Sequence, residues 1–250
     1  MVHLLPLPGS PRFDGMQAVL DRATRDAETL VAAGFDGLVV ENFGDAPFYP
    51  GSVEPVTVAA MARAIEAVRS AVGAAVPLVA NVLRNDARSA LGIAAALDLA
   101  AIRVNVHVGA RVTDQGLIAG MAHETARLRA QWAPRVQIWA DVRVKHSAPL
   151  GAERPLAEEA KEAVGRGLAD AVIVTGSGTG AAVSLEDLAH AASAGAPVLV
   201  GSGVDARTVA DILSRADGAI VGTATKVGGV TTGPVDRARA RAIAEAAGVA

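Results

Sequence analysis

The strongest constraint in this sequence is a repeated alternation between short apolar runs and longer alanine-rich or amphipathic segments along its 250 residues. The short runs are typical of β-strands and the longer segments of α-helices. The expected strands are Val2–Leu5, Gly37–Glu41, Leu78–Leu83, Ile102–His107, Gln137–Val142, Ala171–Thr175, Val198–Gly201 and Ala219–Gly222. The expected helices are Gly15–Ala33, Val56–Val72, Ala87–Leu97, Gln115–Gln131, Leu156–Gly167, Leu185–Ser193, Ala206–Ser214 and Val235–Ala247.

This order predicts an α/β fold, a single-domain (β/α)8 TIM barrel over residues 1–250. Strands such as Leu38-Val39-Val40 are almost continuously apolar, as expected when helices cover both faces of a parallel sheet. A doubly wound open sheet is the alternative. That fold would favour a G-x-G-x-x-G turn after the first strand, where this chain reads Pro6-Leu7-Pro8-Gly9-Ser10-Pro11.

Composition excludes several classes of function. The net charge of −3 argues against nucleic acid as a partner, since nucleic acid would require a basic surface. The absence of cysteine excludes disulfides, cysteine-ligated metals and thiol catalysis. No apolar run approaches the roughly 20 residues of an integral membrane segment, and prolines interrupt the N-terminal apolar stretch, so no signal peptide is expected. We therefore expect a cytoplasmic protein, and its alanine-rich helices are compatible with a homo-oligomer.

Polar side chains gather at the predicted carboxyl ends of neighbouring strands, where active sites of such barrels lie. Leaving buried polar groups unpaired costs about 1–3 kcal/mol each, which favours a ligand over a purely structural role. We predict Asp141 as a general acid or base with His107 as its partner, and Lys145 as a group that stabilises developing negative charge. The predicted substrate-binding residues are Glu41, Asn42, Asn81, Arg103, Asn105 and Thr175.

Each of these residues also has a structural alternative. Arg103 could form a buried ion pair with a neighbouring carboxylate, and Glu41 and Asn42 could bond to loop backbone. Capping is the expected role of Asp45, Asp86 and Asp114, because each starts a loop or helix. A divalent metal at His107, Asp141 and Glu41 is a minor option, since no close-spaced ligand pair supports it. No metal ligand or other cofactor is therefore assigned.

Glycine-rich turns after the last strands indicate a phosphate site. Backbone N–H groups can approach an anion closely at such turns, and barrels often bind phosphate after their seventh and eighth strands. Lys226 follows the last of these turns as a further donor. Tight βα connections are the alternative explanation for the glycines. The predicted phosphate-binding residues are Gly176, Gly201, Ser202, Gly203, Gly222 and Thr223, with Gly176 in the Thr175–Gly180 turn.

Longer strings of residues resemble the BtpA family over essentially the whole chain. They include His3–Pro11, Val40–Phe48, Asn81–Ala87, Ile102–His107, Val112–Gly116, Ala140–Val142, Val144–His146 and Val172–Gly176. The family is named for a photosystem I biogenesis protein, an extrinsic thylakoid protein of cyanobacteria, and includes SgcQ proteins encoded near sugar-uptake and epimerase genes. The resemblance implies a barrel like those that bind ribulose phosphate. It supplies no catalytic residues.

Two functions of different classes follow. The first is an enzyme that acts on a small phosphorylated sugar or nucleoside-like metabolite by isomerisation, lyase or glycosidic-bond chemistry. The second is a non-enzymatic scaffold or photosystem I assembly factor, which would require an exposed apolar patch or a basic face. The polar strand ends favour the enzyme, because a scaffold has no use for them.

Overall fold

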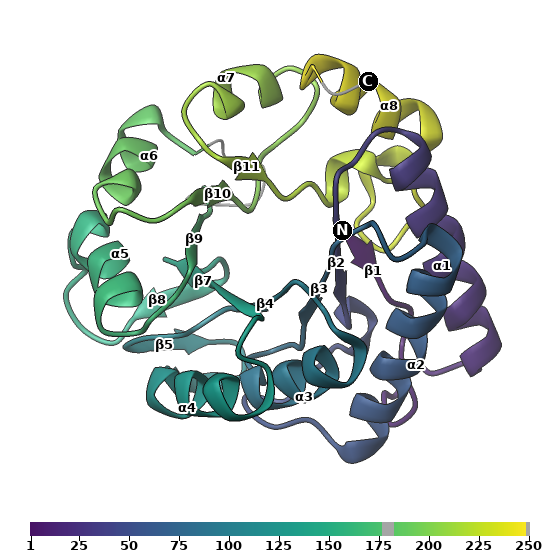
Figure 1. The fold of residues 1–250 in the computed structure, drawn as a ribbon, viewed down its shortest axis with the longest axis horizontal. Coiled ribbons are helices and arrows are strands. Elements are labelled where there is room, and N and C mark those ends of the chain that lie inside the picture. The colour runs from purple at the N-terminus through teal and green to yellow at the C-terminus, as the bar shows by residue number, and fades with distance from the viewer. Residues whose placement is uncertain (177–182, 249–250) are drawn as a thin grey trace.

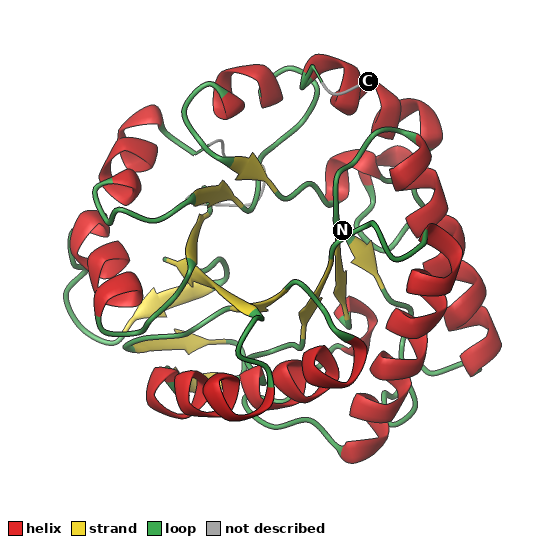
Figure 2. Cartoon of the chain, viewed as in Figure 1, coloured by secondary structure: helices red, strands yellow, loops and turns green. Residues whose placement is uncertain are grey.

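The computed structural model describes residues 1–176 and 183–248, and it has a TIM-barrel fold (Figure 1). Eight parallel strands form one curled sheet, and Figure 2 shows them in yellow inside a ring of helices. In spatial order they are β1 (Val2–His3), β2 (Leu38–Glu41), β3 (Leu78–Asn81), β4 (Ala101–Val104), β7 (Gln137–Val142), β9 (Ala171–Val174), β10 (Val198–Val200) and β11 (Gly218–Ala219).

Helices cover the outer face of this sheet. They are α1 (Met16–Ala32), α2 (Pro55–Val72), α3 (Ala87–Leu97), α4 (Ala122–Trp132), α5 (Leu156–Gly165), α6 (Leu185–Ala192), α7 (Val209–Leu213) and α8 (Arg237–Ala246), with 3-10 turns η1 (Phe43–Asp45), η2 (Thr223–Thr225) and η3 (Val227–Gly229). Among the helices so described, none combines the length and apolarity needed to cross a membrane.

Alternate side chains of each strand pack into two separate apolar clusters, because successive residues of a strand face opposite sides. Val40, Ala80 and Ile102 belong to the large cluster between strands and helices. Val39 and Val79 belong to a small second cluster that also contains Met1, Ala101, Ile173 and Ile220. This second cluster fills the inside of the barrel and forms an apolar floor beneath the strand ends.

The predicted barrel is confirmed, and each predicted strand overlaps an observed one. β2 and β7 end where predicted, and the other six strands end earlier, most of all β4, which ends at Val104 and not at His107, and β11, which ends at Ala219 and not at Gly222. The predicted alternation of Arg103, Asn105 and His107 on one face therefore does not extend to His107. The predicted cap at Asp86 is present, because its side chain accepts a hydrogen bond from the Ser89 N–H. The side chain of Ser184 caps α6 in the same way, through the Asp187 N–H.

A second, antiparallel sheet contradicts the helix predicted for residues 115–131 over its first part. Its strands are β5 (Ala110–Thr113), β6 (Gly116–Ala119) and β8 (Ser147–Pro149), in the order β6-β5-β8. Val112 pairs with Leu117 across a two-residue hairpin turn, and Gly116 has a φ of +94°, which favours glycine. Only α4, from Ala122 onward, is helical in this stretch.

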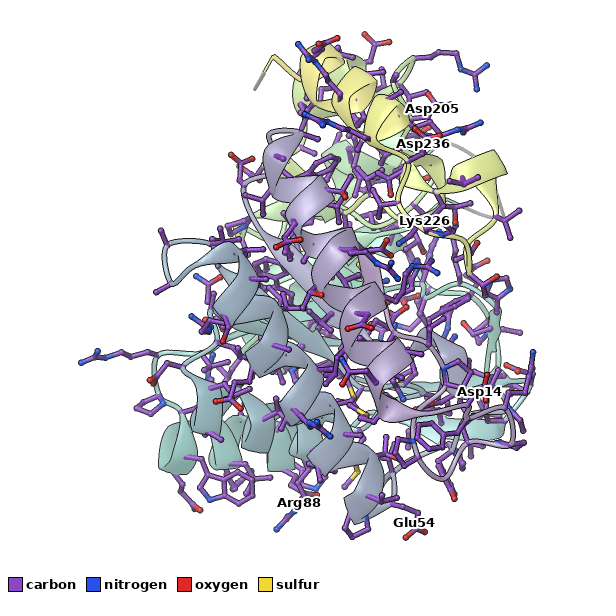
Figure 3. The ribbon with its side chains drawn as sticks, turned by 90° about the vertical axis from the view of Figure 1, so that its right-hand side faces the viewer. Asp14, Glu54, Arg88, Asp205, Lys226 and Asp236 are labelled. Carbon is purple, nitrogen blue, oxygen red and sulfur yellow. The ribbon has the colours of Figure 1, made fainter. Side chains whose placement is uncertain are left out.

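A buried ion pair fixes the C-terminal segment to α1. The Nζ of Lys226, which is 0% exposed, lies 3.0 Å from the Oδ2 of Asp26. Asp26 also accepts hydrogen bonds from Arg22 and from the Val235 N–H. Figure 3 shows the C-terminal segment that carries Lys226 lying against α1. Lys226 therefore cannot serve as the phosphate donor expected of it.

We predict that Asp26→Ala lowers the free energy of unfolding by about 3–5 kcal/mol, because Lys226 would remain as an unpaired buried charge. Urea denaturation measures this loss. Asp21→Ala is the matched control on the same helix, since Asp21 is exposed and bonds only Gln17 through its side chain. Equal unfolding midpoints for the two variants would contradict the structural role of the pair.

Candidate functional site

Polar side chains form a layer directly above the apolar floor of the barrel. The strand register places His3 opposite Glu41, Glu41 opposite Asn81, and Asn81 opposite Arg103. Residues in register on parallel strands face the same side, and Val39 and Val79, two positions earlier, face the interior. Four neighbouring strands thus present polar groups to the inside of the barrel at their carboxyl ends.

An ion pair between Arg103 and Asp141 organises this layer. The Nε of Arg103 lies 3.1 Å from Oδ1 of Asp141, and its Nη2 lies 3.0 Å from Oδ2. The Nδ2 of Asn105 donates to the same Oδ2 at 2.7 Å. Burial acts to lower the pKa of Arg103, but the carboxylates of Asp141 and Glu41 outweigh it and raise that pKa. Arg103 is thereby held as a cation inside the barrel.

The geometry does not support Asp141 as the proton-transfer group. Its side chain is 0% exposed, and both of its oxygens accept hydrogen bonds from Arg103 or Asn105. Protonation of this carboxyl would break the ion pair. Of the two alternatives that the sequence allowed for Arg103, the structure shows the buried ion pair.

Asn81 and Asn105 are brought together as predicted. The Nδ2 of Asn81 donates to Oδ1 of Asn105 at 3.1 Å and to the carbonyl oxygen of Arg103 at 3.2 Å. The Oδ1 of Asn81 is buried and has no partner among the described residues. Asn105 reaches the cavity described below, whereas Asn81 lies behind it and supports Asn105.

A cavity of about 920 Å³ opens above this layer, within the size range of small-molecule sites. The predicted residues that line it are Glu41, Arg103, Asn105, Lys145, Gly201, Ser202, Gly203, Gly222 and Thr223. Sequence reasoning missed other lining residues that carry polar or charged groups, namely His3, Arg84, Asp114, His146, Asp205, Arg207 and Thr231. Most of these lie on loops, which have no periodic signal.

Glu41, Asp114 and Asp205 bring carboxyl groups to the cavity, and of these three Glu41 is the buried one. It is 6% exposed, and burial raises its pKa, an effect that the charge of Arg103 opposes in part. A carboxyl group of raised pKa stays protonated to higher pH than an ordinary glutamate, which suits general acid–base chemistry. Glu41, which we expected to bind substrate, is therefore a better candidate than Asp141 for proton transfer.

His3 lies beside Glu41 and is the most informative residue that the sequence analysis missed. Its Nε2 is 3.7 Å from Oε1 of Glu41, and its Nδ1 is 3.1 Å from the carbonyl oxygen of Thr231. Burial lowers the pKa of His3 to about 3, so the ring is neutral. Because a carbonyl oxygen only accepts, Nδ1 carries the proton and Nε2 offers a lone pair towards Glu41. The sequence could have revealed His3, because it is a polar residue within an otherwise apolar first strand.

Lys145 lines the same cavity from the loop between β7 and β8. Burial lowers the pKa of Lys145, and the charge of Arg103 lowers it further. The Nη2 of Arg84 donates to the Lys145 carbonyl oxygen at 2.8 Å and so ties this loop to the one after β3. Lys145, Arg84 and Arg103 give this wall a positive charge.

The glycine turns after β10 and β11 form the opposite wall. Among the described residues, the N–H groups of Ser202, Gly203, Gly222 and Thr223 have no hydrogen-bond acceptor. The Gly201 N–H instead donates to the Val174 carbonyl oxygen, so the predicted phosphate contact through this N–H is wrong. Glycine is still needed there, because a Cβ would lie 2.6 Å from Cγ2 of Ile173.

Two predicted residues on the loop after β9 support this wall from outside the cavity. The Gly176 N–H donates to Oγ of Ser202 at 3.1 Å, and the Thr175 hydroxyl donates to the Arg143 carbonyl oxygen at 3.0 Å. The rest of the predicted Thr175–Gly180 turn lies outside the described residues.

His107 and Asn42 lie away from the main cavity. The Nε2 of His107 is 2.8 Å from the Gly167 carbonyl oxygen, beyond the end of β4, so His107 is not the partner of Asp141. Asn42 donates to Oδ2 of Asp45 at 3.0 Å and accepts from the Leu83 N–H at 2.7 Å, next to a second cavity. Within residues 1–176 and 183–248, no cluster of His, Asp and Glu side chains has the geometry of a metal site.

The fold and this cavity define a (β/α)8 barrel of the architecture found in phosphosugar enzymes. Phosphoribosyl anthranilate isomerase of Thermus thermophilus superposes with a TM-score of 0.57 at 14% identity, over 88% of this chain and 92% of that one. Orotidine 5′-phosphate decarboxylase of Pyrococcus horikoshii superposes with a TM-score of 0.58 at 17% identity, over 91% and 93%. At these identities the likeness concerns the fold alone.

The chain belongs to the BtpA family, whose model matches residues 1–248. Photosystem I biogenesis protein BtpA of Synechocystis sp. is 45% identical over 98% of this chain and 86% of its own length. An uncharacterized protein of Thermococcus kodakarensis is also 45% identical, over 99% of this chain and 93% of its own. The predicted family is thereby confirmed.

We predict that Glu41 makes the stability of the protein fall with rising pH. A raised folded-state pKa means that the contribution of Glu41 is fully present below the ordinary glutamate pKa and is lost as pH rises through the raised value. The free energy of unfolding of wild type relative to Glu41→Gln should therefore decrease over that interval, with a slope of at most about 1.4 kcal/mol per pH unit.

Urea denaturation at a series of pH values between about 4 and 8 measures this difference, and titrations that do not depend on the charge of Glu41 cancel in the comparison. Glu66→Gln, which changes an exposed glutamate of α2, is the matched control and should follow wild type throughout. A wild-type advantage that stays constant or grows with pH would contradict the raised pKa.

Proposed function

We propose that this protein is an enzyme that acts by acid–base catalysis on a small phosphorylated sugar-type metabolite at the carboxyl ends of the barrel strands. The observation that carries the proposal is the Glu41 carboxyl group, buried and raised in pKa, in a cavity of about 920 Å³ that also contains the glycine turns after β10 and β11. The likeness in fold to phosphosugar enzymes supports it.

The phosphate group would bind at the turns of Ser202–Gly203 and Gly222–Thr223. Their N–H groups supply donors, and Gly203 has a φ of +73°, which allows the backbone to turn sharply there. Arg207 lines the same cavity beside these turns, where it is paired with Asp205. Backbone donors together with nearby cations are a common arrangement for binding a phosphate monoester.

The other end of the substrate would lie against Glu41, Arg103 and Lys145. Glu41 takes a proton from a carbon or hydroxyl of the substrate and returns it, with the neutral His3 beside it. Lys145 and Arg103 stabilise the negative charge that develops on the neighbouring oxygen. This chemistry fits an isomerase or a lyase, and proton donation to a leaving group would equally serve cleavage of a glycosidic bond.

A second candidate function is assembly of a photosystem, because the Synechocystis relative is named for photosystem I biogenesis. Exposed apolar side chains on the antiparallel sheet and directly after it favour a binding surface: Val112 is 43% and Leu117 57% exposed, and Leu150, which follows β8, is 63% exposed. Under this alternative, substitutions in the cavity would leave binding to isolated thylakoid membranes unchanged, and substitutions of these apolar residues would abolish it.

We predict that ribose 5-phosphate or a related sugar phosphate raises the melting temperature, with a stabilisation of about 2.7 kcal/mol at a hundredfold excess over its Kd. Lys145→Met should weaken that binding by about 10–100-fold, because a charge-assisted hydrogen bond would be lost. Titration calorimetry measures the affinities.

Lys161→Met is the control for this comparison, since Lys161 is an exposed lysine on α5 outside the cavity. The control should bind sugar phosphates as wild type does. Lack of stabilisation by any sugar phosphate, or by inorganic phosphate, would argue against the proposed function.

A further inference from the structure

A second cavity of about 310 Å³ adjoins the main one and is used by none of the groups assigned above. Phe48 and Leu83 line both cavities and so form the boundary between them. Glu41 lines the main cavity, and the next residue, Asn42, lines the second. A single molecule that extends past Phe48 would therefore occupy both cavities and pass close to Glu41.

Aromatic residues are concentrated at this boundary although the chain holds only four phenylalanines, one tyrosine and two tryptophans. Phe43, Phe48 and Tyr49 all stand on the segment that follows β2. Phe43 lines the main cavity, Phe48 lines both, and Tyr49 lines the second cavity while remaining 48% exposed. An exposed tyrosine next to a cavity presents a flat apolar face on which a planar ring can stack.

The two cavities differ in charge. Arg84, Arg103 and Lys145 line the main cavity, which suits an anionic group. The second cavity is lined by the carboxyl groups of Asp45 and Glu54, and no lysine or arginine lines it in the described part of the chain. Figure 3 shows Glu54 at the edge of the molecule, at the start of α2. A second phosphate would be repelled there, so the occupant is not an anion.

Polar atoms in the second cavity indicate that the occupant has hydrogen-bonding edges. Polar residues that line this cavity include Ser10, Asn42 and Asp45, and Thr57, 6% exposed, lines it from the first turn of α2. A purely apolar ring would leave the polar groups that it covers unpaired, which costs free energy, whereas the edge of a heteroaromatic ring can pair with them.

We infer that the substrate is a nucleotide-type molecule, whose phosphorylated sugar fills the main cavity and whose uncharged nucleobase-like ring fills the second, against Phe48 and Tyr49. This inference rests on the proposed function and narrows its substrate class. It places the bond between sugar and ring at the boundary of the two cavities, beside Glu41.

Titration calorimetry with ribose 5-phosphate and with the four common ribonucleoside 5′-monophosphates tests the inference. At least one nucleotide should bind wild type about tenfold or more tightly than ribose 5-phosphate. Tyr49→Ala should remove most of that gain and leave the affinity for ribose 5-phosphate unchanged, because Tyr49 lines only the second cavity. Phe48→Ala should weaken the nucleotide more than ribose 5-phosphate, because Phe48 lines both cavities.

Phe13→Ala is the matched control, because Phe13 is a partly exposed phenylalanine that lines neither cavity. If ribose 5-phosphate binds but no nucleotide binds more tightly, or if Phe48→Ala and Tyr49→Ala weaken both ligands equally, the inference is overturned and the proposed function stands. If neither ribose 5-phosphate nor any nucleotide binds, both are overturned. Tyr49 is exposed, so its variant is expected to fold even if Phe48→Ala does not.

Discussion

The ion pair of Arg103 with Asp141 is the interaction on which the carboxyl end of the barrel depends. A guanidinium inside a barrel is costly unless a carboxylate compensates it with good geometry, and here two hydrogen bonds at 3.0 and 3.1 Å do so. The pair holds the guanidinium group of Arg103 directly above the apolar floor of Val39, Val79, Ala101, Ile173 and Ile220. Because Arg103 donates two hydrogen bonds to Asp141, Glu41 faces the cavity without a hydrogen bond of its own to Arg103.

In this arrangement the carboxyl group of Asp141 has a structural role, whereas that of Glu41 is the one proposed for proton transfer. Asp141 is fully enclosed, whereas burial raises the pKa of Glu41 beside a neutral His3. Across the cavity, the turns after β10 and β11 present backbone N–H groups. Phe48 separates the main cavity, which basic residues line, from the second cavity, which acidic and aromatic residues line. The molecule thus offers distinct environments to an anionic group, to a reacting centre and to an uncharged ring.

Periodicity in the sequence was sufficient to predict the barrel and most of the polar layer. Alternation along strands is enforced by burial on both faces, so Asn81, Arg103, Asn105 and Asp141 could be brought together from their spacing alone. His107 was misplaced because the spacing does not say where a strand stops. The hairpin of β5 and β6 was read as helix, although Thr113-Asp114-Gln115-Gly116 contains a turn signal. The second cavity could not be predicted, because it is built from irregular loops whose paths depend on tertiary contacts.

Membership of the BtpA family and the barrel fold identify the scaffold, and we propose that the side chains at the strand ends carry the chemistry. The central claim is that a phosphorylated ligand binds at this end, with its phosphate on the glycine turns and its sugar towards Glu41. A crystal structure of the protein soaked with ribose 5-phosphate tests it most directly. The account predicts ligand density with the phosphate within hydrogen-bond distance of the backbone of Gly203 and Gly222. A ligand bound elsewhere, or an empty cavity at saturating ligand, would contradict it.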